Sequence, residues 1–490
     1  MQKVYIHGAE ALEYEQSLIP AVQPDKSRVL QAVGGCLKLA GLDARCSSSK
    51  TWNPLGELIR PGQTVLLKPN LVKEDHPTDS EGWKYVLTHG SLISAVAYYV
   101  VRALEGRGRI LIADAPQTDS SFEKICQRLS LYEIAAHYHS PALDFEILDL
   151  RKEEWESVDE VIVARKAIPG DPAGYVSFDL ADTSEFKGHN GAGRYYGADY
   201  DAAEVNRHHS HGHHEYLISK SVIQADVIVS LPKLKTHKKA GVTASLKNAV
   251  GLNGDKNWLP HHTEAGNADP GDERPMTSRK QMVERTSARA LRSLSLRLPG
   301  PGTWLHRHAR SLGKRVFGDT EQVIRSGNWW GNDTIWRTCL DLNKILLYGL
   351  PDGSMRSDRP DQRRTHLVFL DAVISGEGAG PMRPDPVNTR FVAFGTNPAA
   401  VDAAGAWLMG FDPDRIPIIR RAFLCRHYGI AEGTWRDVQA VSNKPEWNGW
   451  LESIAPAACF RFKPALGWKN YVERSPQRAG SEKLKQYVNA

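Results

Sequence analysis

The stretch DVIVSLPK, residues 226–233, decides the fold class of this 490-residue chain. Its run of Val, Ile and Leu is typical of a strand that is buried on both faces of a mainly parallel sheet. Four further runs share this character: TVLLKPN (Thr64 to Asn70), RILIADAP (Arg109 to Pro116), HLVFLDAV (His366 to Val373) and RFVAFGTNP (Arg390 to Pro398). We therefore predict five strands of one buried sheet.

Helical stretches separate these strands. Ser91 to Leu104 has Ala and Val at helical spacing, and Pro398 to Met409 follows Asn397, a residue type that caps helix N-termini. The alternation of strand and helix predicts an α/β chain with a doubly wound, mainly parallel sheet core.

The chain is too long for a single hydrophobic core, so we expect several parts. They are an α/β N-terminal part (1–150), an inserted irregular or β subdomain (151–215), a core strand with a Lys/His-rich site segment (216–266), a basic helical or mobile insertion (267–325) and an α/β C-terminal part (326–490).

Positive charge is concentrated in one segment. The net charge is +5, but Arg274 to Arg315 holds eleven Lys or Arg and one acid, about +10, which leaves about −5 elsewhere. Nucleic-acid binding by the whole molecule is therefore not expected. Leu291, Leu294 and Leu298 predict an amphipathic helix in this segment. That helix either contacts an anionic membrane surface or an acidic partner, or is simply solvated.

The N-terminus lacks a secretory signal, and no apolar run is long enough to span a bilayer, so we expect a cytoplasmic protein. The six cysteines form no C-x-x-C pair, which predicts reduced thiols and no iron–sulfur cluster. No nucleotide-cofactor motif and no G-x-S-x-G elbow is present.

Each predicted strand ends in polar residues: Lys68 and Asn70, Asp114, Lys233 through His237, Asp371, and Thr396 with Asn397. The carboxyl ends of strands in open α/β sheets border the ligand crevice, so these ends predict one site. The alternative is that the same residues cap the following helices.

The densest polar constellation is LPKLKTHKKAGVTASLKNAVGLNGDKNWLPHHTE, residues 231–264. Its lysines, together with His237, follow a buried strand, where an ammonium can meet a carboxylate, phosphate or enolate. We therefore predict an anionic ligand. The alternative is a solvated basic loop.

Two further patterns suggest a metal. Five histidines fall between His208 and His214, and nine of the 18 histidines lie between His189 and His262. Neutral imidazole and carboxylate suit a divalent ion, with zinc, iron, manganese and nickel all open. The alternative is hydrogen-bonding histidines or adventitious metal. In DAVISGEGAGPMRPDP, Asp371 ends a strand and Glu377 is expected in a Gly-rich loop, so the two could share a metal or act as an acid/base pair.

At these residues the chain resembles the bacterial family called domain of unknown function 362. The matching phrases, in order, are LLKPNLV, THG, IADAP, LPKLKTHKKAGVTASLKNAVG, DKNWLPHHTE, GNDTIWRTCLDLNKIL, DAVISGEGAGPM and GTNPAAVDAAGAWLMGFDP, spanning roughly residues 60 to 415. The family usually has Thr-His-Pro where this chain has THG, and many members carry iron–sulfur cysteine clusters that this chain lacks.

The Lys-x-Lys-x-His segment is also faintly similar, over about 25 residues, to the lactate racemase superfamily. That likeness implies a cleft acting on a hydroxy- or carboxylate-bearing molecule. Longer members of the first family resemble proteins encoded beside cell-surface polysaccharide genes, which implies a sugar or sugar-phosphate substrate.

We therefore expect a metal-assisted enzyme acting on an anionic small molecule, either isomerase/racemase-like or hydrolytic. Lys68, Lys233, Lys235 and His237 are the expected catalytic residues, with His237 as general acid/base. The substrate-binding residues are Asn70, Lys247, Asn248 and Arg337, and the metal ligands are His213, His214, His261, His262, Asp114, Asp371 and Glu377. The alternative is a non-catalytic metal- or anion-binding accessory protein of a cell-surface polysaccharide or other biosynthetic assembly.

Overall fold

The computed structural model describes residues 2–15, 26–158, 161–197, 201–266, 269–273, 324 and 326–474. Its helices are α1 (Arg28–Leu39), α2 (Trp83–Val86), α3 (Gly90–Ala103), α4 (Phe122–Arg128), α5 (Leu131–Tyr138), α6 (Ala202–His208), α7 (Lys220–Gln224), α8 (Ser245–Asn248), α11 (Ile335–Tyr348), α12 (Pro398–Leu408) and α13 (Pro417–Ala422). Its strands are β1 (Gln2–Gly8), β2 (Thr64–Pro69), β3 (Gly108–Asp114), β4 (Leu143–Asp149), β5 (Glu153–Val158), β6 (Val161–Ala167), β7 (Tyr175–Asp179), β8 (Tyr195–Tyr196), β9 (Glu215–Ser219), β10 (Val227–Leu231), β11 (Lys233–His237), β12 (Gly241–Thr243), β13 (His262–Thr263), β14 (Thr365–Ala379), β15 (Arg383–Val387), β16 (Phe391–Gly395), β17 (Val438–Ser442) and β18 (Gly449–Trp450).

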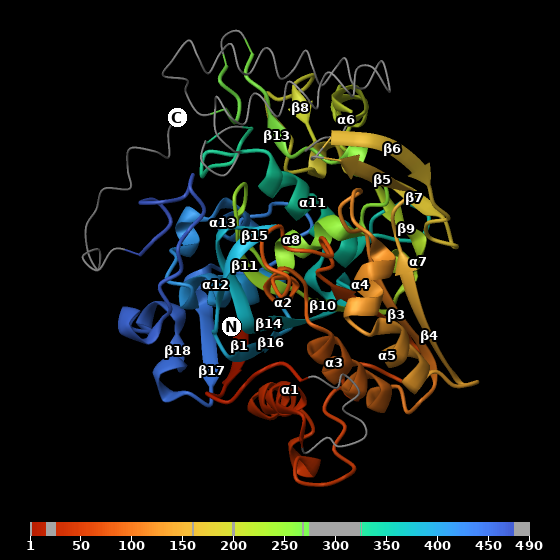
Figure 1. Ribbon diagram of the computed structural model, residues 1–490, viewed down its shortest axis with the longest axis vertical. Helices are drawn as coiled ribbons and strands as arrows, with labels where there is room; N and C mark the ends of the chain where they lie inside the picture. The colour runs from red at the N-terminus through yellow and green to blue at the C-terminus, as the bar shows by residue number, and fades with distance from the viewer. Residues whose placement is uncertain are drawn as a thin grey trace.

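A mixed sheet, twelve-stranded within the described residues, forms the centre of the molecule (Figure 1). Its path runs β18-β17-β1-β16-β14-β10-β2-β3-β4; β11 and β15 pair with β14, and β12 pairs with β11. Neighbours from β14 to β4 are parallel, whereas β16 is antiparallel to both β14 and β1. The chain is therefore α/β, with a parallel run inside a mixed sheet.

Alternate side chains of the sheet enter separate cores, because successive residues of a strand point to opposite faces. In β14, Leu367 and Phe369 pack in a cluster with residues of α1 and α3, whereas Val368 and Leu370 pack with residues of α11 and α12. Figure 1 shows α1 and α3 at the lower edge of the view, away from α11. Helices thus cover both faces of the sheet, so a binding site is expected at the ends of the strands.

The predicted strands and helices are present. The five apolar runs overlap β2, β3, β10, β14 and β16, and the two helical stretches overlap α3 and α12. Asn397 caps α12, because its side chain accepts the Ala400 backbone N–H at 3.0 Å. The capping alternative therefore holds for Asn397.

The lysines that follow β10 lie on a second strand and do not form the polar end of β10. Pro232 cannot donate to the ladder and so interrupts the strand, and its carbonyl accepts the Asp371 backbone N–H at 2.8 Å. The chain then resumes as β11, which pairs in parallel with the later part of β14. Two-residue periodicity places Lys233 and Lys235 on one face of β11.

Two expectations about strand ends are wrong. Glu377 lies within β14, which continues to Ala379 and pairs with β15, and not in a Gly-rich loop. Thr396 and Asn397 follow β16, which is antiparallel to β14, so they lie at the opposite edge of the sheet from Asp371. An apolar run does not encode strand direction, because its side chains can be buried whichever way the strand runs.

Residues 151–215 contribute small β elements that lie outside the main sheet. β5 pairs with β6, β7 with β9, and β8 with β13, and Figure 1 shows these pairs in the upper half of the view. The basic segment Arg274–Arg315 lies outside the described residues. Within the described ranges no helix is long and apolar enough to cross a membrane.

Candidate functional site

The carboxyl ends of β2 and β3 bring Lys68 and Asp114 together. The Lys68 ammonium lies 2.8 Å from an Asp114 carboxylate oxygen, and both side chains are almost fully buried. The other oxygen of Asp114 accepts the Leu71 backbone N–H at 2.7 Å. Burial lowers the pKa of Lys68, and the Asp114 charge opposes this shift. The ion pair therefore lies inside the protein, where charges interact more strongly than in water.

Asn248 and Asn70 complete this group. The Asn248 amide oxygen accepts Lys68 Nζ at 3.0 Å, and its amide nitrogen donates to the Lys68 carbonyl at 2.9 Å. Asn70 Nδ2 lies 3.5 Å from the same Asn248 oxygen. Because Asn248 is the last residue of α8, these bonds hold α8 against β2. Four of the predicted site residues thus lie together.

A second buried ion pair joins β11 to β14. Lys233 Nζ lies 2.8 Å from an Asp371 carboxylate oxygen, and neither side chain is exposed. Tyr14 donates to Asp371 at 2.7 Å, and the His89 backbone N–H donates at 2.9 Å. Lys233 also donates to the Tyr14 hydroxyl and the Lys84 carbonyl. Its three ammonium hydrogens therefore all have protein partners.

Lys235 and Lys247 keep unused donor capacity. Lys235 is fully buried, and among the described residues its Nζ bonds to the Val86 carbonyl alone. Lys247 is partly buried and has no hydrogen bond or ion pair within the described part of the chain. Burial lowers the pKa of both amines, and the charges of Lys233 and Lys247 lower that of Lys235 further.

His237, at the end of β11, is held in one tautomer. Its Nδ1 accepts the backbone N–H groups of Lys239 and Ala240, each at 3.1 Å. The proton of the neutral ring is therefore on Nε2. Burial, followed by the charges of Lys247, Lys238 and Lys235, lowers the pKa of His237 well below its ordinary value. The ring is thus a neutral donor that lies within the electrostatic reach of the lysines.

The basic side chains around Asp114 outnumber the acid. The Asp114 charge raises the pKa of Lys68, Lys235, Lys247 and Lys256 alike, so all four ammonium groups lie within its reach. Burial nevertheless lowers the pKa of each, that of Lys256 to about 7. Among the described residues Lys68 is the lysine that forms an ion pair with Asp114, and Lys247 is only partly buried.

Gly251 is required for this arrangement. A Cβ at this position would lie 1.8 Å from Asp114 Oδ1 and 2.8 Å from Lys68 Nζ. We expect Gly251→Ala to lower the free energy of unfolding by about 1–3 kcal/mol, the usual cost of overpacking. Gly429→Ala is the control, because its Cβ would meet nothing nearer than 3.6 Å. Urea unfolding that gives the two variants equal stability would contradict the arrangement.

Two of the histidines predicted to bind metal lie near β7. His213 is exposed, and its Nδ1 lies 2.5 Å from an Asp179 carboxylate oxygen, which raises the pKa of the ring. His214 is buried, and its Nδ1 lies 3.4 Å from Nδ1 of His209. Burial lowers the pKa of the His214 ring to about 4. These two imidazoles therefore have different surroundings although they are adjacent in sequence.

The other two histidines that were predicted to bind metal lie near the lysines that follow β10. The His261 ring donates to the Leu259 carbonyl at 2.9 Å, and His262 Nδ1 lies 3.4 Å from Lys239 Nζ. Burial, followed by the Lys247 charge, lowers the pKa of His261 to about 3. No three His, Cys, Asp or Glu side chains of the described residues form a group that could hold a metal ion. The metal ligand set stays a prediction.

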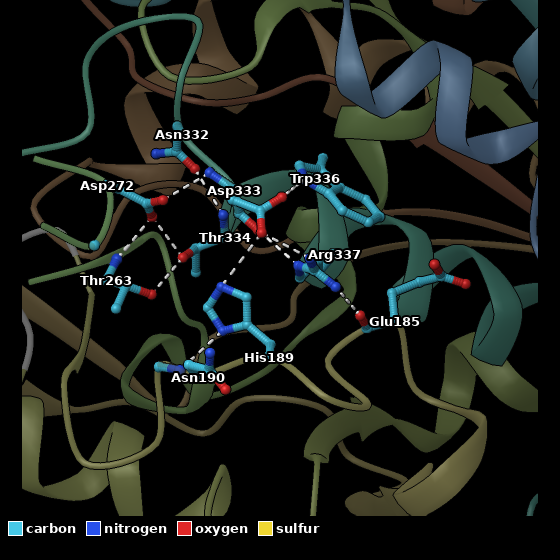
Figure 2. A network of polar contacts seen from close by, with 12 residues as sticks. Glu185, His189, Asn190, Thr263, Asp272, Asn332, Asp333, Thr334, Trp336 and Arg337 are labelled. Atoms are coloured by element: carbon cyan, nitrogen blue, oxygen red, sulfur yellow. Dashed lines mark hydrogen bonds and ion pairs between the residues drawn. The ribbon is translucent and has the colours of Figure 1, made fainter. Parts of the chain in front are cut away.

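Glu377 and Arg337 lie in separate networks. Glu377 accepts the Lys463 backbone N–H at 2.8 Å and pairs with its ammonium at 3.1 Å. Figure 2 shows Arg337 turned toward Asp333 and Glu185; it pairs with Asp333 at 2.7 Å and donates to the Glu185 carbonyl. In the same network Asp333 also faces His189, at 3.6 Å. Arg337 therefore ties the start of α11 to the neighbouring loop.

Sequence reasoning missed four residues that support the site: Tyr14, His89, Lys256 and Asp402. Asp402 is buried in α12 and accepts the backbone N–H groups of Ser245 and Leu246 at 2.7 and 2.9 Å, which anchors α8. Burial raises its pKa to about 7. A single acid in an Ala-rich helix was a usable signal for Asp402. Tyr14 reaches its partner only through tertiary contacts, so no local pattern marks it.

Residues 169–407 match the family model described as "Domain of unknown function (DUF362)". The predicted resemblance to this family is thereby confirmed for these residues. The DUF362 match includes β11, α8 and Asp371, whereas Lys68 and Asp114 lie before it. The likeness to the lactate racemase superfamily stays a prediction.

A curated relative of this chain is the thylakoid-associated protein sll1697 of Synechocystis sp. (strain ATCC 27184 / PCC 6803 / Kazusa). It is 24% identical over 212 residues, which are 43% of this chain and 46% of the relative. The match thus spans less than half the length of that relative. A structural-genomics crystal structure of a Thermotoga maritima protein aligns with a TM-score of 0.28 and 10% identity, covering 68% of this chain and 50% of that one. A TM-score this low does not show that the two proteins share a fold.

Proposed function

We propose that the chain is a cytoplasmic enzyme that acts on an anionic small molecule bound beside Lys235, His237 and Lys247. The imbalance of buried charge carries the proposal. The Asp114 charge acts on four lysines but forms an ion pair with Lys68, and the partly buried Lys247 ammonium has no partner among the described residues. Buried charges are normally paired. An anionic group of the substrate would supply the missing negative charge.

The same residues suggest the chemistry. Lys235, whose pKa lies well below its ordinary value, suits a general base, and the Nε2–H of His237 can donate to a developing oxyanion. Lys247 would bind the carboxylate or phosphate of a small acid, sugar or sugar phosphate. This set favours proton abstraction beside a carbonyl, as in an isomerase or racemase. Hydrolysis is the second reaction that it supports.

The site's position supports the proposal too. We infer that the parallel strands from β14 to β4 form a doubly wound core. Ligands of such sheets bind at the carboxyl ends of the strands, which is where the proposed site lies. The predicted divalent metal is a separate proposal. Its test is elemental analysis of the purified chain before and after treatment with a chelator.

Anion binding is tested by thermal melting of the full chain with inorganic phosphate, glycolate, malonate and glucose 6-phosphate. Binding to the native state must raise the melting temperature. We expect at least one of these anions to do so, and Lys247→Met to weaken its apparent affinity about 10-fold or more, the cost of one charge-assisted hydrogen bond. Lys187→Met is the matched control, because Lys187 is exposed and pairs with an exposed Asp182. Equal responses from the two variants would refute the assignment.

The alternative is a non-catalytic anion-binding accessory protein of a polysaccharide or other biosynthetic assembly, docked to a membrane or acidic partner through Arg274–Arg315. The name of the thylakoid-associated relative favours it. Incubation in D₂O with glycolate and related 2-hydroxy and 2-oxo acids separates the two hypotheses. Deuterium exchange at the carbon beside the carboxylate supports the enzyme, whereas binding without turnover of any probe supports the accessory protein.

A further inference from the structure

A cavity of about 230 Å³ lies at the opposite edge of the sheet from the lysine site. It is lined by the start of β14, by Thr396 and Asn397 after β16, and by the end of α11. The antiparallel pairing of β16 with β14 brings these segments together. The proposed function leaves this cavity unexplained.

His366 gives the cavity its chemical character. Its side chain lines the cavity and is 5% exposed, and among the described residues neither ring nitrogen has a hydrogen-bond partner. Burial, followed by the Arg364 charge, lowers the pKa of the ring to about 4. The neutral ring offers one donor and one acceptor. Leaving both unmade costs free energy, so the ring is suited to a polar partner.

Two arginines line the same cavity as this ring, and the Asp226 charge acts on one of them, Arg364. Arg364 is buried and donates to the Ile223 and Gly349 carbonyls at 2.7 and 2.9 Å, while its buried Nε has no partner in the part of the chain that the structure describes. Arg363 also lines the cavity and lies 3.7 Å from Glu432, an exposed acid. None of the described residues that line the cavity is acidic. The polar end therefore favours an anion.

Apolar side chains form the rest of this lining wall, among them Leu58, Leu347 and Ile430. An inorganic anion would leave this wall without a partner, whereas an organic acid would place carbon atoms against it. The volume corresponds to about eight water-sized groups at about 30 Å³ each. We propose that this cavity binds a small monocarboxylate with a branched apolar body, its carboxylate beside His366 and the two arginines.

Calorimetric titration of the full chain with 3-methylbutanoate tests the proposal, with 3-methylbutanamide as a neutral isostere. We expect the acid to bind at least about tenfold more tightly than the amide, a difference of about 1.4 kcal/mol. A wild-type chain that gives no binding heat with the acid, or that binds acid and amide equally, would overturn the proposal. Either result would mean that water alone occupies the cavity or that charge is not recognised.

Two variants locate the site. His366→Leu should weaken binding of the acid at least about tenfold, whereas His139→Leu, a histidine on the exposed surface, should stay within about twofold. If His366→Leu does not fold, Thr396→Trp serves instead, because Thr396 is an exposed residue of the cavity lining and a Trp there would close the entrance. Unchanged affinity in whichever of these variants folds would place the acid elsewhere and refute the site. Neither result depends on Lys247, so failure here is distinct from failure of the proposed function.

Discussion

The Asp371→Asn variant is expected to lose about 3–5 kcal/mol of unfolding free energy, because it leaves the Lys233 charge buried without its partner. The two groups lie 2.8 Å apart, and both are inaccessible to solvent. The Asn side chain would also have to accept the Tyr14 hydroxyl and the His89 backbone N–H with one oxygen. Urea unfolding monitored by tryptophan fluorescence measures the loss.

Two controls isolate the ion pair. Asp182→Asn removes an equal charge from an exposed pair and should change stability by no more than about 0.5 kcal/mol. Adding Lys233→Met to Asp371→Asn removes the stranded ammonium and should restore part of the stability. A double variant as unstable as the sum of its single changes would show that the two side chains act independently, contrary to the structure.

The strands could be predicted from sequence because both faces of this sheet are covered by helices. A doubly buried strand must be apolar along its length, and that pattern is visible in runs such as VIVSL in β10. The direction of β16 could not be predicted, because an apolar run reads the same in either orientation. The separation of Thr396 from Asp371 follows directly from that missing information.

The lysine site was predictable to a similar degree. Lys68, Asp114 and Asn248 do converge, because each lies at or beside the carboxyl end of a parallel strand. The sequence does not show which of the lysines forms an ion pair with an acid. Lys233 and Lys235 are two residues apart on one strand, yet of these two lysines Asp371 pairs with Lys233 within the described residues. That difference arises from tertiary contacts with β14 and α2.

Among the described residues Lys235 has no ion-pair partner, and this leads to the second large effect. Lys235→Met keeps the length of the side chain and removes the amine. We expect the exchange of substrate hydrogen for deuterium to slow about 10²–10⁴-fold, the usual contribution of a general base. Anion affinity, which depends on Lys247, should change much less. NMR detection of exchange and thermal melting with the same anion measure the two quantities separately.

The same variant should be more stable than the wild type at neutral pH. The folded state lowers the pKa of Lys235 well below its ordinary value of 10.5, so the unfolded chain binds more protons between the two values. Stability contributed by this group therefore rises as pH rises through that window, and the penalty is largest below the folded pKa. The gain in melting temperature from Lys235→Met should accordingly shrink as the pH approaches 10.5. A variant that melts lower than the wild type, with anion binding and exchange lost together, would identify Lys235 as a structural residue, because a catalytic amine can be removed without loss of the fold.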